Sequence, residues 1–200
     1  MKAIGGPDVA TVINTVIPPG NVGFVNSNMY PNDSSNTRIF TAIQASLANC
    51  GITLAPKPEP GSSFFTDLGN APESNKAGAW DMGQAAWIPD WFGNNGRTVI
   101  QALFQGPNCV INTVNYGCYD SSTVNSLIQQ AEAATSLSAA GAAWHQADMQ
   151  IMKDAAIVPM LSQNFPQYSS SRVRGVGFAT AIFAPNIGEP DITNVWLTNG

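Results

Sequence analysis

Apolar side chains recur at helical spacing in two parts of the chain. After Asp33–Asn36, where several residues could cap a helix, apolar positions follow at three- and four-residue steps. Gly51 then stands where a left-handed residue commonly ends a helix, so we predict a helix over Asn36–Cys50. Further along, Asp120-Ser121-Ser122 precedes apolar positions spaced i, i+3, i+4 and i+7, which predicts a second helix. The apolar positions are Ile39, Phe40, Ile43 and Leu47 in the first helix and Val124, Leu127, Ile128 and Ala131 in the second.

Another helix is predicted to begin near Ser138 and to run through Trp144 to Ala155. A short link separates it from the preceding helix, so the two are expected to form a helical hairpin. Shorter helices are predicted at Phe64–Leu68 and Arg97–Phe104.

Short apolar runs predict strands between these helices. Pro89 should end one of them, and Pro159 within another indicates an edge or an end, because proline has no N–H for a strand ladder. A helix, a glycine and a strand in immediate succession form the αβ half of a parallel α/β unit, so the predicted class is α/β. The predicted strands are Ile52–Ala55, Met82–Trp87, Ile157–Leu161, the alternating positions Val173, Val176 and Phe178, and Ile192–Leu197.

Residues 80–96 are the most distinctive stretch, because they hold three of the five tryptophans and two aspartates. If Pro89 ends the strand, Asp90 lies just beyond the strand end, between Trp87 and Trp91 in the sequence. Loops on a rigid scaffold often carry binding residues. Such a carboxylate could bind an ammonium group, with cation–π contact to the indoles, or accept hydroxyls from a sugar stacked on an indole. The alternative is a core strand with structural tryptophans, in which Asp90 caps the following turn.

The sequence offers little for catalysis. Asp81 and Asp90 bracket the same predicted strand, and at ~3.3 Å per residue they would lie roughly 30 Å apart, whereas an acid/base pair needs ~5–10 Å. The only histidine, His145, has Asp148 three residues later but no identifiable nucleophile. We interpret His145 as a helix-surface residue, and we expect no enzyme, no catalytic residue and no cofactor.

Charge excludes several partners. Charged residues make up 10% of the chain, the net charge is −5, and the eight Lys and Arg residues are scattered. Nucleic acids and anionic membrane surfaces are therefore not expected as partners. No apolar run of about 18 residues is present, so no direct membrane insertion is expected. Met1–Gly6 lacks a signal sequence and a lipid-attachment cysteine, which indicates either a cytosolic protein or a piece of a longer chain.

The three cysteines allow two interpretations. Cys109 and Cys118 are nine residues apart and could close a short disulfide loop, worth ~2–3 kcal/mol if the geometry permits. Cys50, at the end of a predicted helix, is expected to be a buried thiol. The other interpretation is a metal site, which a single histidine and the lack of a Cys-x-x-Cys pair oppose.

The order of these motifs resembles that of family 5 of the bacterial extracellular solute-binding proteins, the receptors of peptide and dipeptide ABC importers. The similarity extends from about Val16 to Leu197. The matching stretches are Asn36–Cys50 followed by Gly51-Ile52, Trp87-x-x-Asp90, Asn115-Tyr116-Gly117-Cys118-Tyr119-Asp120, Leu127–Ala131, Trp144–Asp148 and Asp154–Met160.

The resemblance implies a lobe of the type II periplasmic-binding-protein fold, with a mixed sheet flanked by helices and a helical hairpin. In peptide-binding members the aspartate of the Trp-x-x-Asp motif pairs with the peptide α-amino group. That aspartate is Asp90 here, with Trp87 as the motif tryptophan, and Trp91 keeps an aromatic wall where many members have tyrosine. Asn115 and Tyr116 are further ligand-binding candidates.

This chain also departs from the family pattern. Some relatives have an arginine three residues before the motif tryptophan, which meets a peptide carboxylate; Gln84 stands there, so that contact is in doubt. The three clustered tryptophans and the missing arginine make an oligosaccharide the alternative ligand. Within the stretch, Trp80 and Met82 are expected to be packing residues.

Family members are usually well over twice this length. We therefore expect residues 1–200 to be a single ligand-binding lobe without its first lobe, shortened between Gly23-Phe24 and Asn32-Asp33. The resemblance places the full-length parent outside the cytoplasm, lipid-anchored, with ABC permease subunits as its partners.

Overall fold

The computed structural model describes residues 10–11, 36–49, 51, 54, 64–69, 73, 82–89, 94, 96–163, 170–175, 177–178, 190–191 and 195–198. All structural statements below concern these residues. The predicted features at Cys50, Trp80, Asp81, Asp90 and Trp91, and most of the predicted strand at 52–55, lie outside them.

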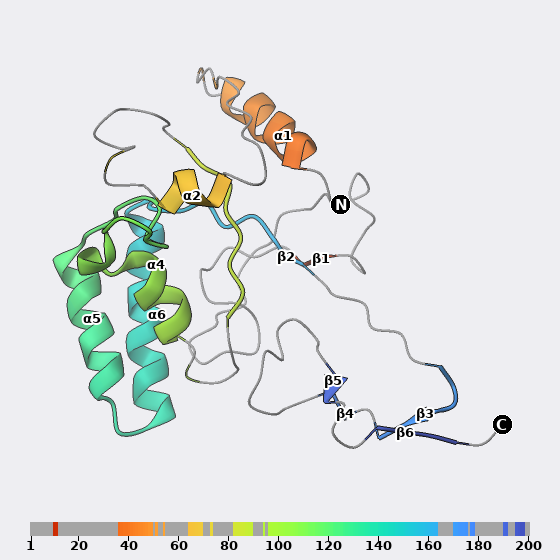
Figure 1. Cartoon of the computed structure of the whole chain (residues 1–200). Helices are drawn as coiled ribbons and strands as arrows, with labels where there is room; N and C mark the ends of the chain where they lie inside the picture. Colours follow the sequence, from red (N-terminus) through yellow and green to blue (C-terminus); the bar gives the residue numbers. More distant parts are fainter. Residues whose placement is uncertain are drawn as a thin grey trace.

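The helical hairpin contributes most of the buried core, and its presence confirms the predicted pair of antiparallel helices. Helices α5 (Ser122–Ala133) and α6 (Leu137–Lys153) run side by side, as Figure 1 shows. Each begins at a serine whose hydroxyl accepts a backbone N–H, Ser121 from Val124 and Ser136 from Ala139. These caps satisfy amide groups that the first turn of a helix leaves without partners.

The hydrophobic core lies between the hairpin and one short helical stretch that precedes it. That stretch consists of a π-helical turn, η2 (Arg97–Gln101), continued by α4 (Ala102–Phe104), so the predicted helix 97–104 exists with a wider first turn. A 3-10 turn, η3 (Gly106–Asn108), follows. The buried cluster consists of Val99, Ile100, Phe104, Val124, Leu127, Ile128, Ala131, Ala140, Ala143, Trp144, Ala147 and Ile151.

Two helices lie earlier in the chain, α1 (Asn36–Ala48) and α2 (Phe64–Gly69), and both agree with the predictions. Gly51 has φ +77°, and its N–H donates to the carbonyl of Ala48 at 3.0 Å. This is the left-handed residue expected just after the helix, where glycine avoids the strain of a Cβ.

The described strands form three antiparallel pairs, each two residues long. The pairs are β1 (Ala10–Thr11) with β2 (Ser162–Gln163), β3 (Val173–Arg174) with β6 (Trp196–Leu197), and β4 (Gly177–Phe178) with β5 (Pro190–Asp191). The described residues contain no parallel pairing of the expected mixed sheet. Where the last strand was predicted, pairing is present at Trp196–Leu197, and Val195 is not part of it.

The predicted strand Ile157–Leu161 is wrong, since pairing begins only at Ser162. Ala155 has φ +52°, and the N–H of Ala156 donates to the carbonyl of Ile151 at 3.2 Å. The C-terminal end of α6 therefore occupies the chain as far as residue 156. Pro159 then offers no N–H to a ladder, and the strand therefore follows the proline.

The predicted strand Met82–Trp87 is also wrong. Residues 82–89 have neither helix nor strand, and the described part of the chain contains no strand paired with them. Met82, expected to pack inside, is 51% exposed. An apolar run becomes a strand only when its backbone groups find a partner, and a single sequence does not reveal that partner.

Candidate functional site

Trp87 is the part of the Trp-x-x-Asp motif that the structure describes. Its indole Nε1–H donates to the backbone carbonyl of Thr98 in η2, and 36% of the residue remains exposed. The neighbouring Ile88 is 49% exposed, whereas Pro89 is buried. Trp87 is therefore held at one edge and accessible elsewhere, as a residue in a binding wall would be. Gln84, three residues before it, is half-buried.

A second indole fixes the chain just after the motif. The Nε1–H of Trp144, a fully buried residue of α6, donates to Asn94 Oδ1 at 2.6 Å. Gly96 lies against the same ring so closely that a Cβ there would overlap three indole atoms. Asn94 was expected only as part of a polar loop, and no spacing links it to a residue fifty positions away. Trp144 itself was predicted on the apolar side of its helix.

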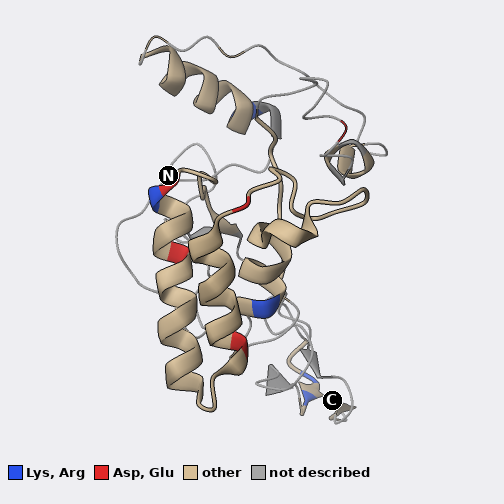
Figure 2. Cartoon of the chain, turned by 90° about the vertical axis from the view of Figure 1, so that its left-hand side faces the viewer, with Lys and Arg blue, Asp and Glu red and all other residues tan. Residues whose placement is uncertain are grey.

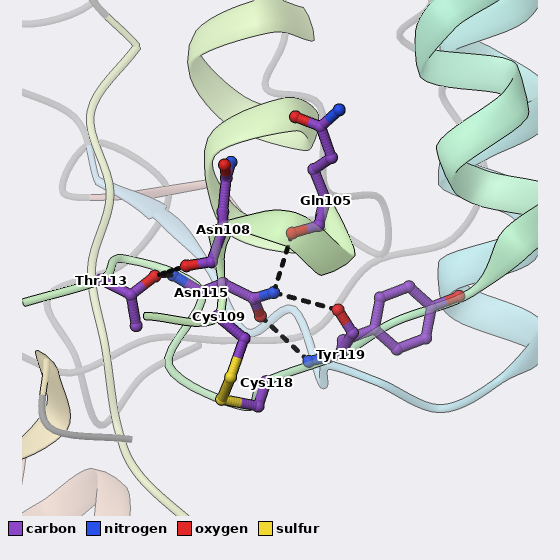
Figure 3. The surroundings of a disulfide bond; sticks show 7 residues. All are labelled: Gln105, Asn108, Cys109, Thr113, Asn115, Cys118 and Tyr119. Carbon is purple, nitrogen blue, oxygen red and sulfur yellow. Dashed lines mark hydrogen bonds between the residues drawn. A yellow bond between two sulfur atoms is a disulfide. The ribbon is translucent and has the colours of Figure 1, made fainter. Parts of the chain in front are cut away.

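Cys109 and Cys118 form a disulfide with a Cα–Cα distance of 4.9 Å, shown in Figure 3. Asn112 and Cys118 have positive φ values, +64° and +48°, within the loop that the disulfide closes. The loop tip is apolar and open to solvent, since Val110 and Ile111 are 57% and 58% exposed.

Asn115 lies at the centre of this loop and is fully buried. Its Nδ2 donates to the carbonyls of Gln105 at 3.2 Å and Tyr119 at 3.0 Å, and its Oδ1 accepts the N–H of Tyr119 at 3.0 Å (Figure 3). Its backbone N–H donates to Thr113 Oγ1 at 2.9 Å. Both amide hydrogens and the amide oxygen are used inside the chain, so the side chain fixes the loop conformation.

Two tyrosines follow Asn115. Tyr116 is half-buried, and burial raises the pKa of its hydroxyl. Tyr119 packs edge-on against Phe104, with ring centroids 6.0 Å apart, and its hydroxyl donates to Asp154 Oδ2 at 2.7 Å. Burial and this hydrogen bond raise the pKa of Tyr119 to about 12. The contact ties the disulfide loop to the end of α6.

His145 lies half-buried on α6, beside a hollow of about 580 Å³ between α5 and α6. The hollow is lined by Thr123, Leu127, His145, Gln146, Met149, Gln150 and Lys153. It contains no serine or cysteine nucleophile for the imidazole. Asp148, three residues after His145, fits by its spacing either a residue that orients the imidazole or one on a solvated helix face; it is 2% exposed, so it does not lie on a solvated face.

Charged residues are scattered along the described part of the chain, as the coloured ribbon of Figure 2 shows. The ion pair between Arg97 Nε and Glu132 Oε1, at 3.9 Å, joins η2 to α5 at the surface. Within the described ranges, no three His, Cys, Asp or Glu residues gather as a metal site would require. Nor does any helix in these ranges have the length and apolar character needed to cross a bilayer.

No protein-family profile and no curated protein matches this sequence. Solved structures do match. The clavulanic acid biosynthesis oligopeptide binding protein 2 is similar over 99% of this chain and 41% of its own, with a TM-score of 0.80 and 19% identity. The ABC transporter-associated periplasmic binding protein DppA from Helicobacter pylori, in complex with the peptide STSA, has a TM-score of 0.68 and 20% identity, over 98% of this chain and 42% of its own. HbpA2 from Haemophilus parasuis has a TM-score of 0.69 and 15% identity, over 96% and 41%.

These similarities define the fold class as that of the type II periplasmic binding proteins, which confirms the predicted class. The resemblance to peptide receptors of ABC importers is confirmed at the level of the fold. This chain spans about two fifths of the length of the matching structures.

Proposed function

We propose that this chain is the ligand-binding lobe of a peptide receptor that serves an ABC importer. The observation that carries the proposal is the similarity of fold, over 98–99% of the chain, to one protein described as oligopeptide binding and to a periplasmic binding protein in complex with a peptide. Under this proposal the protein is a binding protein and has no catalytic role. Its full-length parent works outside the cytoplasm and delivers the peptide to permease subunits.

In the proposed site, Asp90 pairs with the α-amino group of the peptide, while Trp87 and Trp91 provide aromatic walls. The accessible indole of Trp87 supports this assignment, because it stands three residues before Asp90 and keeps part of its ring open. Gln84 and Tyr116 are proposed as neutral polar contacts. Asn115 contributes indirectly, by holding the loop that carries Tyr116.

The disulfide supports the proposed location. Disulfides persist in oxidising compartments and are rare in the cytosol, and Cys109–Cys118 closes its loop with a hydrogen-bonded residue at its centre. The same location fits a chain in which only 10% of the residues are charged.

The test is titration of the chain with short peptides, followed by NMR or calorimetry. A lone lobe makes only part of the ligand contacts, so millimolar peptide is needed. Asp90→Asn removes one charge at constant size and should weaken binding roughly tenfold or more, the range of a hydrogen bond to a charged group. A peptide with an acetylated amino terminus is the matched control, and its binding should not respond to Asp90→Asn.

Two results would contradict this assignment. Equal affinity of the wild type and Asp90→Asn for the free-amine peptide would remove Asp90 from the site. Binding of cello- or xylo-oligosaccharides in the absence of any response to peptides would replace the peptide ligand with a sugar.

A further inference from the structure

Two indole N–H groups hold the stretch between Trp87 and Thr98: one joins its two ends to each other, and the other joins it to α6. At its ends, the Trp87 indole donates to the carbonyl of Thr98, eleven residues away. Near its middle, Asn94 accepts the indole N–H of Trp144 from α6 at 2.6 Å. Asp90 and Trp91 lie in the sequence between Trp87 and Asn94.

The hydrogen bond to α6 leads directly into the core. Trp144 has no exposed surface, and it belongs to the same buried cluster as Val99 and Ile100 of η2. Gly96 is buried against the ring, where any side chain would overlap the indole. We name Asn94, Gly96 and Trp144 the indole clamp.

We infer that the indole clamp holds Asn94 and Gly96 on the helical hairpin and, through Thr98, helps to position Trp87, so that Asn94 and Trp144 are positioning residues of the proposed peptide site. The role in binding rests on the proposed function; the mechanical coupling does not. A hydrogen bond from a buried indole has a fixed direction, because the ring cannot turn in a packed core. This hydrogen bond fixes the position of Asn94, which is four residues after Asp90 in the sequence. The hydrogen bond from the Trp87 indole to the carbonyl of Thr98 then ties Trp87 to the same part of the chain.

The coupling can be tested on this chain without ligand, by measuring exchange of the indole N–H groups with solvent in NMR. Asn94→Leu preserves size and removes the acceptor. We expect the exchange of the Trp87 indole N–H to become about tenfold faster, as when one hydrogen bond is lost, although the acceptor of that N–H is Thr98 and not residue 94. Asn94→Asp keeps an oxygen acceptor and should restore the slow exchange. Asn94→Ser, which is smaller and polar, provides a second variant if Asn94→Leu loses its helical signal.

Asn125→Ala is the matched control. Asn125 accepts the N–H of Gly106 at 3.0 Å and donates to Asp120 Oδ1 at 2.8 Å, so the variant loses comparable bonds on α5, away from the segment. Its effect on Trp87 exchange should be absent. Unchanged Trp87 exchange in Asn94→Leu would overturn the inference, and so would an equal acceleration in Asn125→Ala, which would indicate general loosening.

The peptide titration then separates the two claims. If the wild type binds peptide, Asn94→Leu should weaken binding about tenfold and Asn94→Asp should recover it. If the wild type binds no peptide, the proposed function fails, and the exchange measurements still decide whether the clamp exists.

Discussion

The hairpin α5–α6 and the segment 82–89 are both rich in apolar residues, but large apolar side chains are buried in the hairpin and half exposed in the segment. Ile128, Trp144 and Ile151 in the hairpin have no exposed surface, whereas Met82 and Ile88 in the segment are about half exposed, at 51% and 49%. The helices satisfy their backbone hydrogen bonds internally and need partners only for one face. The segment has no such internal solution. An extended apolar run is therefore buried only where another part of the chain supplies both packing and backbone hydrogen bonds, whereas an apolar helix face needs only packing.

The largest effect should come from a matched pair of isoleucines in these two regions. Ile151→Ala removes a fully buried side chain from α6 and should lower the free energy of unfolding by ~2–5 kcal/mol, through lost burial and a cavity. Ile88→Ala, at a half-exposed position, should change it by less than about 0.5 kcal/mol. Urea denaturation of both variants measures the contrast. Similar losses in the two variants would mean that the segment is packed as tightly as the hairpin.

The disulfide loop, which leads into α5, should behave as part of the hairpin region. Cys109→Ser opens the loop and should cost ~2–3 kcal/mol, the loop-closure entropy of a cross-link nine residues apart. Differential scanning calorimetry with and without reductant measures this. Cys50→Ser is the control, because it leaves the disulfide intact and should show the same sensitivity to reductant as the wild type. If Cys109→Ser melts where the wild type does, the loop is held by its hydrogen bonds alone.

A smaller effect is expected at high pH, where Tyr119 joins the disulfide loop to the end of α6. The folded state raises the pKa of Tyr119 from 10.0 to about 12, so the folded chain retains a proton that the unfolded chain loses. Its contribution to stability is complete below pH 10 and is lost as the pH rises through about 12. Tyr119→Phe should show a shallower fall of the urea midpoint over this range. An unchanged slope would assign the fall to other groups.

The helical part of the fold could be predicted because its signals are local. The serines before α5 and α6, the apolar spacing of Val124 to Ala131, and Gly51 all act within a few residues of their helix ends. The strands could not be predicted in the same way. Ser162 pairs with Thr11, about 150 positions earlier, and nothing in either stretch identifies the other.

The residues of the candidate site also differ in how far local sequence signals could predict them. The family resemblance places Trp87 in a binding wall, whereas the spacing alone puts it at the end of a predicted strand and does not decide whether it is buried or accessible. The bond between Trp144 and Asn94 spans fifty residues and leaves no periodic mark. Asn115 was expected to meet ligand because of its place in a motif, yet its side-chain hydrogen bonds are made to the backbone of Gln105 and Tyr119 on either side of the disulfide loop, an outcome that depends on where these two residues lie.

The π-helical turn at Arg97–Gln101 sets the direction in which the preceding chain enters the core. A π turn differs from an α turn by one inserted residue, and such insertions are retained in few helices. Because each residue of an α-helix turns the chain by about 100°, deleting one residue here would rotate everything upstream relative to the anchored Val99 and Ile100. The direction of Trp87, whose indole N–H donates to the carbonyl of Thr98 within this turn, thus depends on the π-helical geometry, and deletion of one residue from Arg97–Gln101 should change it.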